Sequence, residues 1–163
     1  MVTSSAAESS SASKVVIDGL NGFRALVGKR VGTSGPVEVT QAKIEEFCRA
    51  VDNDEWIHWD IERCKKSPFG TTIAPGMFTQ TYFSKLWFDM VDIRNVKNML
   101  FMGSDRVRLI SPLKCGSKFT MTVDVAKVEE REKGIAVYYD VTWNVVGEEK
   151  PVTVAQFIIR YMD

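Results

Sequence analysis

The strongest constraint on the fold is a set of long segments in which apolar and polar residues alternate, as they do in half-buried β-strands. The alternation runs through residues 119–125 and 135–145, and a Lys-Gly turn at 133–134 joins the two. It is also present at 106–109, and at 152–159 both faces are largely apolar. These segments predict antiparallel strands that belong to one curved sheet.

Two helices are predicted before these strands. From Pro75 to Met90 apolar residues occupy nearly every face, so this helix is expected inside the domain. Because proline is favoured at the first helical position, Pro75 is predicted to start it, with Gly76 in its first turn. The other helix is predicted to begin after an N-cap at Thr40 and to end near Val51. A curved sheet wrapped around a buried helix gives the predicted class, α+β.

Length and composition predict one globular domain. The chain has 163 residues, of which 45% are hydrophobic, and can bury a core without a disulfide or metal. Residues 1–14 are rich in serine and alanine and are predicted to be a disordered leader, which leaves 15–163 as a single domain. The apolar stretches are too short to cross a bilayer. A cytoplasmic location is expected, with organelle targeting by the leader left open.

Charge and cysteine content exclude several classes of partner. Lysine plus arginine and aspartate plus glutamate both total 21, so no basic field attracts nucleic acid. The three cysteines form no C-x-x-C pair, which fits buried thiols in a reducing compartment. A single histidine with scattered cysteines cannot assemble the ligand set that zinc favours, so no metal is predicted.

The first candidate for chemistry is His58, the only histidine in the chain. Histidine is the residue type whose unperturbed pKa suits proton exchange near neutral pH. His58 lies in an irregular segment, residues 52–70, with Trp56 beside it and Asp52 and Asp54 nearby. A carboxylate could therefore orient the ring or share the acid-base work. A histidine that is merely packed in a loop is the alternative.

The second candidate is the start of the buried helix, where unpaired backbone N–H groups favour negative charge. Gly76 would let a substrate approach the backbone closely. Its N–H could hold a thioester or other carbonyl oxygen as it becomes an oxyanion. No G-x-G-x-x-G, Walker, H-E-x-x-H or G-x-S-x-G motif occurs, so dinucleotide, nucleotide, zinc-protease and serine-hydrolase functions have no support.

Residues 50–84, AVDNDEWIHWDIERCKKSPFGTTIAPGMFTQTYFS, resemble the core of the MaoC-like hydratases and dehydratases, the hot-dog-fold relatives of (R)-specific enoyl-CoA hydratase. In that family a D-x4-H element with an acid two residues on precedes a Phe-Gly turn and the string I-A-H-G-M. Here WIHWD, PFG and IAPGM follow in the same order. GSDRVRLISPLKCGSKF and PVTVAQFIIRY extend the resemblance over roughly residues 20–162.

The resemblance implies a hot-dog fold, a homodimer and the reversible addition of water to a trans-2-enoyl thioester. In the family, an aspartate and a histidine bind the water and move its protons, while a glycine N–H binds the thioester oxygen. The implied function is an (R)-type hydratase/dehydratase that acts on an enoyl or 3-hydroxyacyl thioester. No resident cofactor is expected, because an acyl carrier such as coenzyme A belongs to the substrate.

Carried over by motif, His58 matches the family histidine, Gly76 matches the oxyanion glycine and Thr81 matches a hydroxyl-bearing helix position. The aspartate does not carry over. Asn53 stands five residues before His58, and its amide cannot accept a proton. Two further departures are Pro75 in place of a histidine and Phe101 where an asparagine is common in one branch.

The departures leave three interpretations open. In the first, Asp52 or Asp54 replaces the carboxylate and hydration is preserved. In the second, His58 acts as a lone base with Asn53 as orienter, which suits dehydration, double-bond isomerisation or another enolate-type rearrangement. In the third, the chain is a non-catalytic partner subunit. The predicted catalytic residues are His58, Asn53, Gly76 and Asp54, and the predicted substrate-binding residues are Thr81, Phe78, Tyr82, Trp56 and Phe101.

Overall fold

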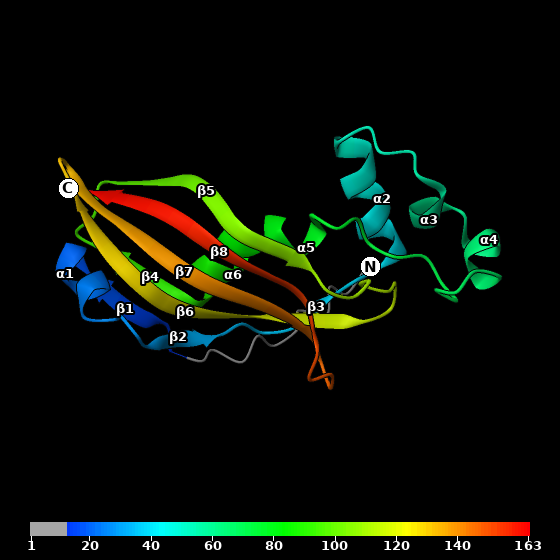
Figure 1. The fold of residues 1–163 in the computed structure, drawn as a ribbon, viewed down its shortest axis with the longest axis horizontal. Helices are drawn as coiled ribbons and strands as arrows, with labels where there is room; N and C mark the ends of the chain where they lie inside the picture. Colours follow the sequence, from blue (N-terminus) through cyan, green and yellow to red (C-terminus); the bar gives the residue numbers. More distant parts are fainter. Residues whose placement is uncertain (1–12) are drawn as a thin grey trace, which may run out of the picture.

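The computed structural model of the chain describes residues 13–163 (Figure 1). The predicted leader, residues 1–14, lies outside the described residues except for its last two. The elements in chain order are β1 (Val15–Asp18), α1 (Gly19–Arg24), β2 (Arg30–Thr33), β3 (Val37–Glu38), α2 (Gln41–Ala50), α3 (Trp56–Trp59), α4 (Ile61–Lys65), α5 (Phe78–Thr81), α6 (Phe83–Met90), β4 (Val91–Arg94), β5 (Asn98–Leu109), β6 (Lys118–Arg131), β7 (Gly134–Val145) and β8 (Pro151–Met162).

The large sheet is antiparallel, as predicted. Within residues 13–163 it has six strands in the order β2-β6-β7-β8-β5, with β3 also paired to β6. The predicted hairpin is present, but its turn lies one residue earlier than predicted, because Arg131 pairs with Gly134 and leaves residues 132 and 133 between the strands. Gly134 has a φ of +108°, and a Cβ there would lie 2.0 Å from the carbonyl oxygen of Tyr161. Only glycine fits this hairpin.

The sheet bends around the central helices. In Figure 1 strands β5, β8, β7 and β6 lie side by side and curve along their length, with α6 behind them. The expected burial of this helix is confirmed, since Phe83 and Trp87 are buried and stack with centroids 5.9 Å apart. Trp87 also packs on Tyr139 of β7, whose hydroxyl donates to Tyr161 of β8 over 2.9 Å. Aromatic contacts thus fasten the helix to the middle of the sheet.

The central helix begins later than predicted and is interrupted. Pro75 does not start it, because residues 75–77 form a turn in which the Phe78 N–H donates to the Pro75 carbonyl oxygen over 2.9 Å. Helix α5 starts at Phe78, and the chain leaves regular helix at Tyr82 before α6. After α6 the chain enters β4, which pairs in parallel with β1. The sequence did not predict that second small sheet.

The other predicted helix is confirmed as α2, with the Thr40 hydroxyl accepting from the Lys43 N–H over 3.2 Å. The segment 52–70, expected to be irregular, contains the short helices α3 and α4. The Asp60 side chain caps the second of these by accepting from the Arg63 N–H over 2.9 Å. In the part of the chain described, no helix is long and apolar enough to cross a membrane.

Candidate active site

A pocket of about 360 Å³ opens where the α3 segment, the turn before α5 and the chain after β5 meet. Two residues singled out from the sequence, His58 and Gly76, both line it. Most of the other walls are aliphatic. The lining consists of Ile57, His58, Ile73, Ala74, Pro75, Gly76, Thr79, Leu109, Ile110, Ser111, Pro112, Leu113 and Thr153.

The His58 side chain is 5% exposed, and its protonation pattern follows from its partner. Nδ1 lies 2.6 Å from the carbonyl oxygen of Ile73. A carbonyl oxygen can only accept a hydrogen bond, so Nδ1 carries the proton of the neutral ring. The other ring nitrogen, Nε2, then has a free lone pair and can accept a proton at the pocket.

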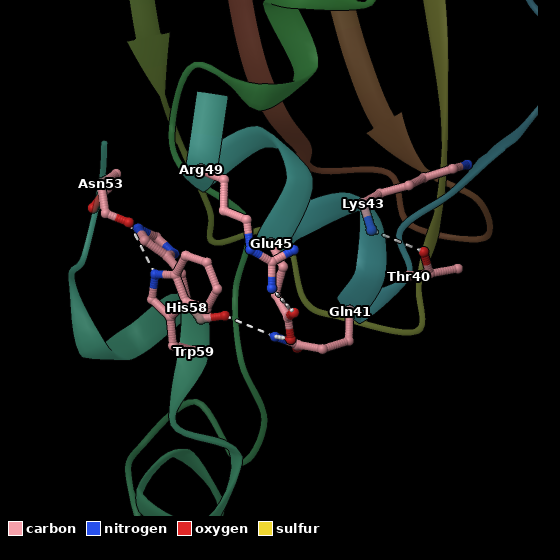
Figure 2. Close-up of polar contacts among 8 residues, drawn as sticks. All are labelled: Thr40, Gln41, Lys43, Glu45, Arg49, Asn53, His58 and Trp59. Carbon is pink, nitrogen blue, oxygen red and sulfur yellow. Dashed lines mark hydrogen bonds and ion pairs between the residues drawn. The ribbon is translucent and has the colours of Figure 1, made fainter. Parts of the chain in front are cut away.

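One side chain ties together the two segments that hold this imidazole. The Gln41 amide nitrogen donates to the His58 carbonyl oxygen over 2.9 Å, as Figure 2 shows, and the Thr72 hydroxyl donates to the Gln41 amide oxygen over 2.6 Å. Thr72 precedes Ile73, whose N–H donates to the Ile57 carbonyl oxygen over 3.1 Å. Gln41 was missed in the sequence. The available signal was an uncharged polar residue on the first turn of α2.

Asn53 lies five residues before His58 in the chain, and its amide oxygen already has a partner. Its amide oxygen accepts from the Glu55 N–H over 3.0 Å. Its carbonyl oxygen accepts from Trp59 Nε1 over 2.9 Å (Figure 2). Asp52 and Asp54 are exposed. Among the residues that the structure describes, no aspartate or glutamate lines the pocket of His58.

The Gly76 backbone faces the pocket with an unused donor. Within residues 13–163, neither the Gly76 N–H nor the Met77 N–H donates a hydrogen bond to the protein. A Cβ on Gly76 would lie 2.4 Å from Cδ1 of Leu109, so glycine allows Leu109 to pack over this turn. An oxyanion at this point of the pocket would find a free donor.

The predicted substrate-binding residues lie outside this pocket. The Thr81 side chain is exposed, and its hydroxyl donates to the Phe78 carbonyl oxygen over 2.7 Å. Phe78 is buried in the core, and Tyr82 lies in a separate groove on the other side of α5 and α6 beside Gly35. Neither lines the His58 pocket.

Two other predicted substrate-binding residues face outward. Trp56 is half-buried under the Arg63 guanidinium, whose carbon lies 3.9 Å from the indole ring centroid. Phe101 is 57% exposed on β5, the edge strand of the large sheet. Their predicted roles therefore depend on a surface other than the wall of the pocket.

Two buried threonines line the pocket, whereas Thr81 does not. Thr79 on α5 and Thr153 on β8 both line the pocket, and their hydroxyl oxygens are 3.1 Å apart. The sequence signal was a polar residue at an inward position of the largely apolar strand β8. Thr153 pairs with Trp143 of β7, which is fully buried.

Cys64 packs against the segment that carries His58. It is buried beneath α3, and its sulfur lies 3.5 Å from the Ile57 carbonyl oxygen. Burial is the main cause that raises the pKa of this thiol, and the charge of Asp60 adds to it. A raised pKa lowers the share of thiolate, the form in which cysteine acts as a nucleophile.

Comparison with known proteins shows which family the chain resembles. The MaoC like domain family matches residues 23–146. The 3-hydroxyacyl-thioester dehydratase Z of Mycobacterium tuberculosis is 35% identical over 139 residues, which cover 85% of this chain and 92% of that protein.

Solved structures share the fold at lower identity. An (R)-hydratase from A. caviae involved in PHA biosynthesis has a TM-score of 0.67 and 17% identity, over 82% of this chain and 95% of its own. A HadBC (3R-hydroxyacyl-ACP dehydratase) complex from Mycobacterium tuberculosis has a TM-score of 0.65 and 19% identity, over 78% of this chain and 93% of its own. The chain belongs to the MaoC-like family of hydratases and dehydratases, and it is a hydro-lyase with the hot-dog fold.

Proposed function

We propose that this chain is an (R)-type hydratase/dehydratase for an enoyl or 3-hydroxyacyl thioester, with His58 as its acid-base group. The observation that carries the proposal is one pocket lined by both the His58 imidazole and the Gly76 turn. The free Nε2 of the ring supplies a base, and the unused N–H supplies an oxyanion donor. The mycobacterial 3-hydroxyacyl-thioester dehydratase that resembles the chain supports the substrate class.

In the dehydration direction, His58 Nε2 takes the proton from C2 of the acyl group. The thioester oxygen gains negative charge and is held by the Gly76 N–H. The electron pair of the broken C2–H bond forms the C2=C3 bond, and the C3–O bond breaks. The departing oxygen takes the proton from the imidazolium and leaves as water, which restores neutral His58. Hydration is the reverse sequence.

Of the three interpretations of Asn53, a lone histidine base is the best supported. No carboxylate lines the pocket within residues 13–163, and the Asn53 amide is occupied by Glu55. A double-bond isomerase would use the same base and the same oxyanion donor, so it is our second candidate. The shared presence of His58 and Gly76 in one pocket argues against a non-catalytic subunit.

The substrate carries its own acyl carrier, and we propose that the reaction uses no cofactor or metal. The pocket walls include Ile57, Ile73 and Leu113, which suit an apolar acyl chain. We keep a cytoplasmic location as a prediction.

We further propose a homodimer that forms along β5. This edge strand exposes three consecutive apolar side chains, Leu100, Phe101 and Met102. Leu109 and Ile110 at its end are also exposed, and both line the pocket. A second copy on this edge would cover the patch and close the mouth of the pocket. The solved HadBC structure of the same fold is itself a complex.

The function is tested with purified protein and crotonyl-coenzyme A. Loss of the enoyl absorbance is expected for wild type, and His58→Ala should lower kcat/KM by about 10² to 10⁴-fold. Lys66→Ala, which changes an exposed residue outside the pocket, should match wild type. If His58→Ala is as active as wild type, the proposed role of the imidazole is wrong. If the wild type does not hydrate the thioester but moves a double bond in an enoyl thioester, and His58→Ala does not, the isomerase is favoured.

A further inference from the structure

We propose that the hydroxyl pair of Thr79 and Thr153 binds the 3-oxygen of the substrate, the atom that leaves as water. The inference rests on the proposed function and assigns a further residue pair to its pocket. It also explains how the site works without the carboxylate expected at Asn53.

The two hydroxyls sit on opposite elements and deep in the fold. Thr79 projects from α5 and Thr153 from β8, and their side chains are 2% and 3% exposed. Both still line the pocket that holds His58. A buried hydroxyl without a partner is unfavourable, so polar residues at such positions need a compensating contact.

The pair satisfies only part of its own hydrogen-bonding capacity. Two hydroxyls carry two protons, and one of these joins Thr79 to Thr153 over 3.1 Å. Within residues 13–163, the Thr153 hydroxyl donates to no protein acceptor. One buried proton at the pocket wall thus lacks an acceptor, and an oxygen of a bound ligand would supply it.

Other polar side chains near the pocket are already engaged. The Ser111 hydroxyl donates to the Pro151 carbonyl oxygen over 3.0 Å, and Asn53 binds Glu55. Among the described lining residues, His58, Thr79 and Thr153 are the side chains that remain for a polar group of the substrate. A hydroxyl pair can hold an oxygen firmly, but it does not remove a proton at neutral pH.

In the proposed reaction, His58 transfers the protons and the two threonines position the oxygen that leaves. The C2–H bond breaks with its proton going to His58 Nε2, and the C3–O bond then breaks with its electron pair on oxygen. That oxygen takes the proton back from His58 and leaves as water. Thr153 donates a hydrogen bond to it throughout and keeps its own proton, so atoms and charge balance.

The test compares two ligands in a His58→Ala background, where the substrate is not consumed and the imidazole makes no contact. (R)-3-Hydroxybutyryl-coenzyme A and butyryl-coenzyme A differ only in the 3-hydroxyl group. Calorimetry should show about tenfold tighter binding of the hydroxylated ligand, the size expected for one buried hydrogen bond. His58→Ala/Thr153→Val, which keeps the shape and removes the hydroxyl, should abolish the preference. His58→Ala/Thr153→Ser should retain it.

The outcomes separate this inference from the proposed function. The role of the pair is overturned if the valine variant prefers the hydroxylated ligand as strongly as His58→Ala does, or if no variant prefers it. This holds whether or not the wild type turns over substrate. Absence of measurable binding of both ligands overturns it as well. If the preference for the hydroxylated ligand is lost only in the valine variant, the role of the pair is supported. A wild type that is inactive with crotonyl-coenzyme A would count against the proposed function alone. Thermal melting of each variant checks that valine has not unfolded the protein.

Discussion

At the scale of single residues, the site depends on where each polar atom finds its partner. His58 Nδ1 is bound to the Ile73 carbonyl oxygen, so Nε2, the nitrogen proposed to act as the base, is left for the pocket. Asn53 differs from His58, because its amide oxygen is already bound to the Glu55 N–H and is not free for a substrate. Sequence position alone therefore does not decide which residue is catalytic.

Asn53→Asp tests this difference. An aspartate can accept the same hydrogen bond from Glu55, so it should remain a turn residue and change kcat/KM with crotonyl-coenzyme A by less than about threefold. Asn53→Ala should lose the contact and destabilise the fold by about 1 kcal/mol, measured by urea unfolding. A large gain of activity in Asn53→Asp would mean that this side chain reaches the substrate and that a carboxylate is missing from the natural site.

At the scale of helices and strands, local signals were predictable and long-range ones were not. Thr40 predicted the start of α2 because capping is a local hydrogen bond, and alternation predicted β6 and β7 because one face of each is buried. β8 was predicted as a strand that is apolar on both faces. The parallel pairing of β1 with β4 joins segments more than 70 residues apart, and no local pattern specifies it. The pocket was predicted only in part, because Thr153 meets Thr79 through tertiary packing.

Gln41 is a contact that couples α2 to the segment that carries His58. Gln41→Leu should remove the hydrogen bonds to His58 and Thr72 and let the imidazole shift. We expect kcat to fall by about ten- to a hundredfold with KM little changed, because the apolar pocket remains. Steady-state kinetics with crotonyl-coenzyme A measure both.

Glu46→Gln, an exposed change on the same helix, is the matched control and should behave as wild type. An unchanged kcat in Gln41→Leu, with the protein folded, would show that the imidazole is held without Gln41. A parallel loss in the control would point to damage of the whole helix instead.

At the scale of the whole molecule, the exposed edge of the sheet bears on assembly and the buried aromatic core bears on stability. The edge strand β5 has an apolar surface that a second copy would cover. The core holds Tyr139 and Tyr161 with their hydroxyls hydrogen-bonded to each other.

Phe101→Asp tests the assembly. A charge in the proposed interface should convert a dimer into a monomer of 18.3 kDa, measured by sedimentation equilibrium, and lower activity by opening the pocket. Val146→Asp, an equivalent change at a 56% exposed apolar residue beyond β7, should leave the dimer intact. A wild type that is already monomeric and active would rule out the proposed interface.

The tyrosine pair predicts a loss of stability at high pH. Burial raises the pKa of Tyr139 and of Tyr161 well above the ordinary value near 10. Both hydroxyls stay protonated in the fold and ionise in the unfolded chain. The contribution of these two tyrosines to the free energy of unfolding should therefore be constant below about pH 10 and fall above it, by about 1.4 kcal/mol per pH unit for each buried tyrosine.

Urea titrations between pH 8 and about 11.5 measure this slope. Tyr139→Phe should make it shallower, whereas Tyr138→Phe, a change at a half-buried tyrosine of the same strand, should not. Equal slopes in wild type and Tyr139→Phe would contradict the expected contribution of the buried hydroxyl.

The most direct test of the central claim is ¹⁵N NMR of the histidine ring, because the single histidine gives a single pair of signals. The spectrum is recorded above pH 8 with and without butyryl-coenzyme A. We expect a neutral ring protonated at Nδ1, with an Nε2 resonance that shifts when the ligand is added. A proton on Nε2, or a ring whose signals do not respond to the ligand, would contradict the assignment of His58 as the base of this pocket.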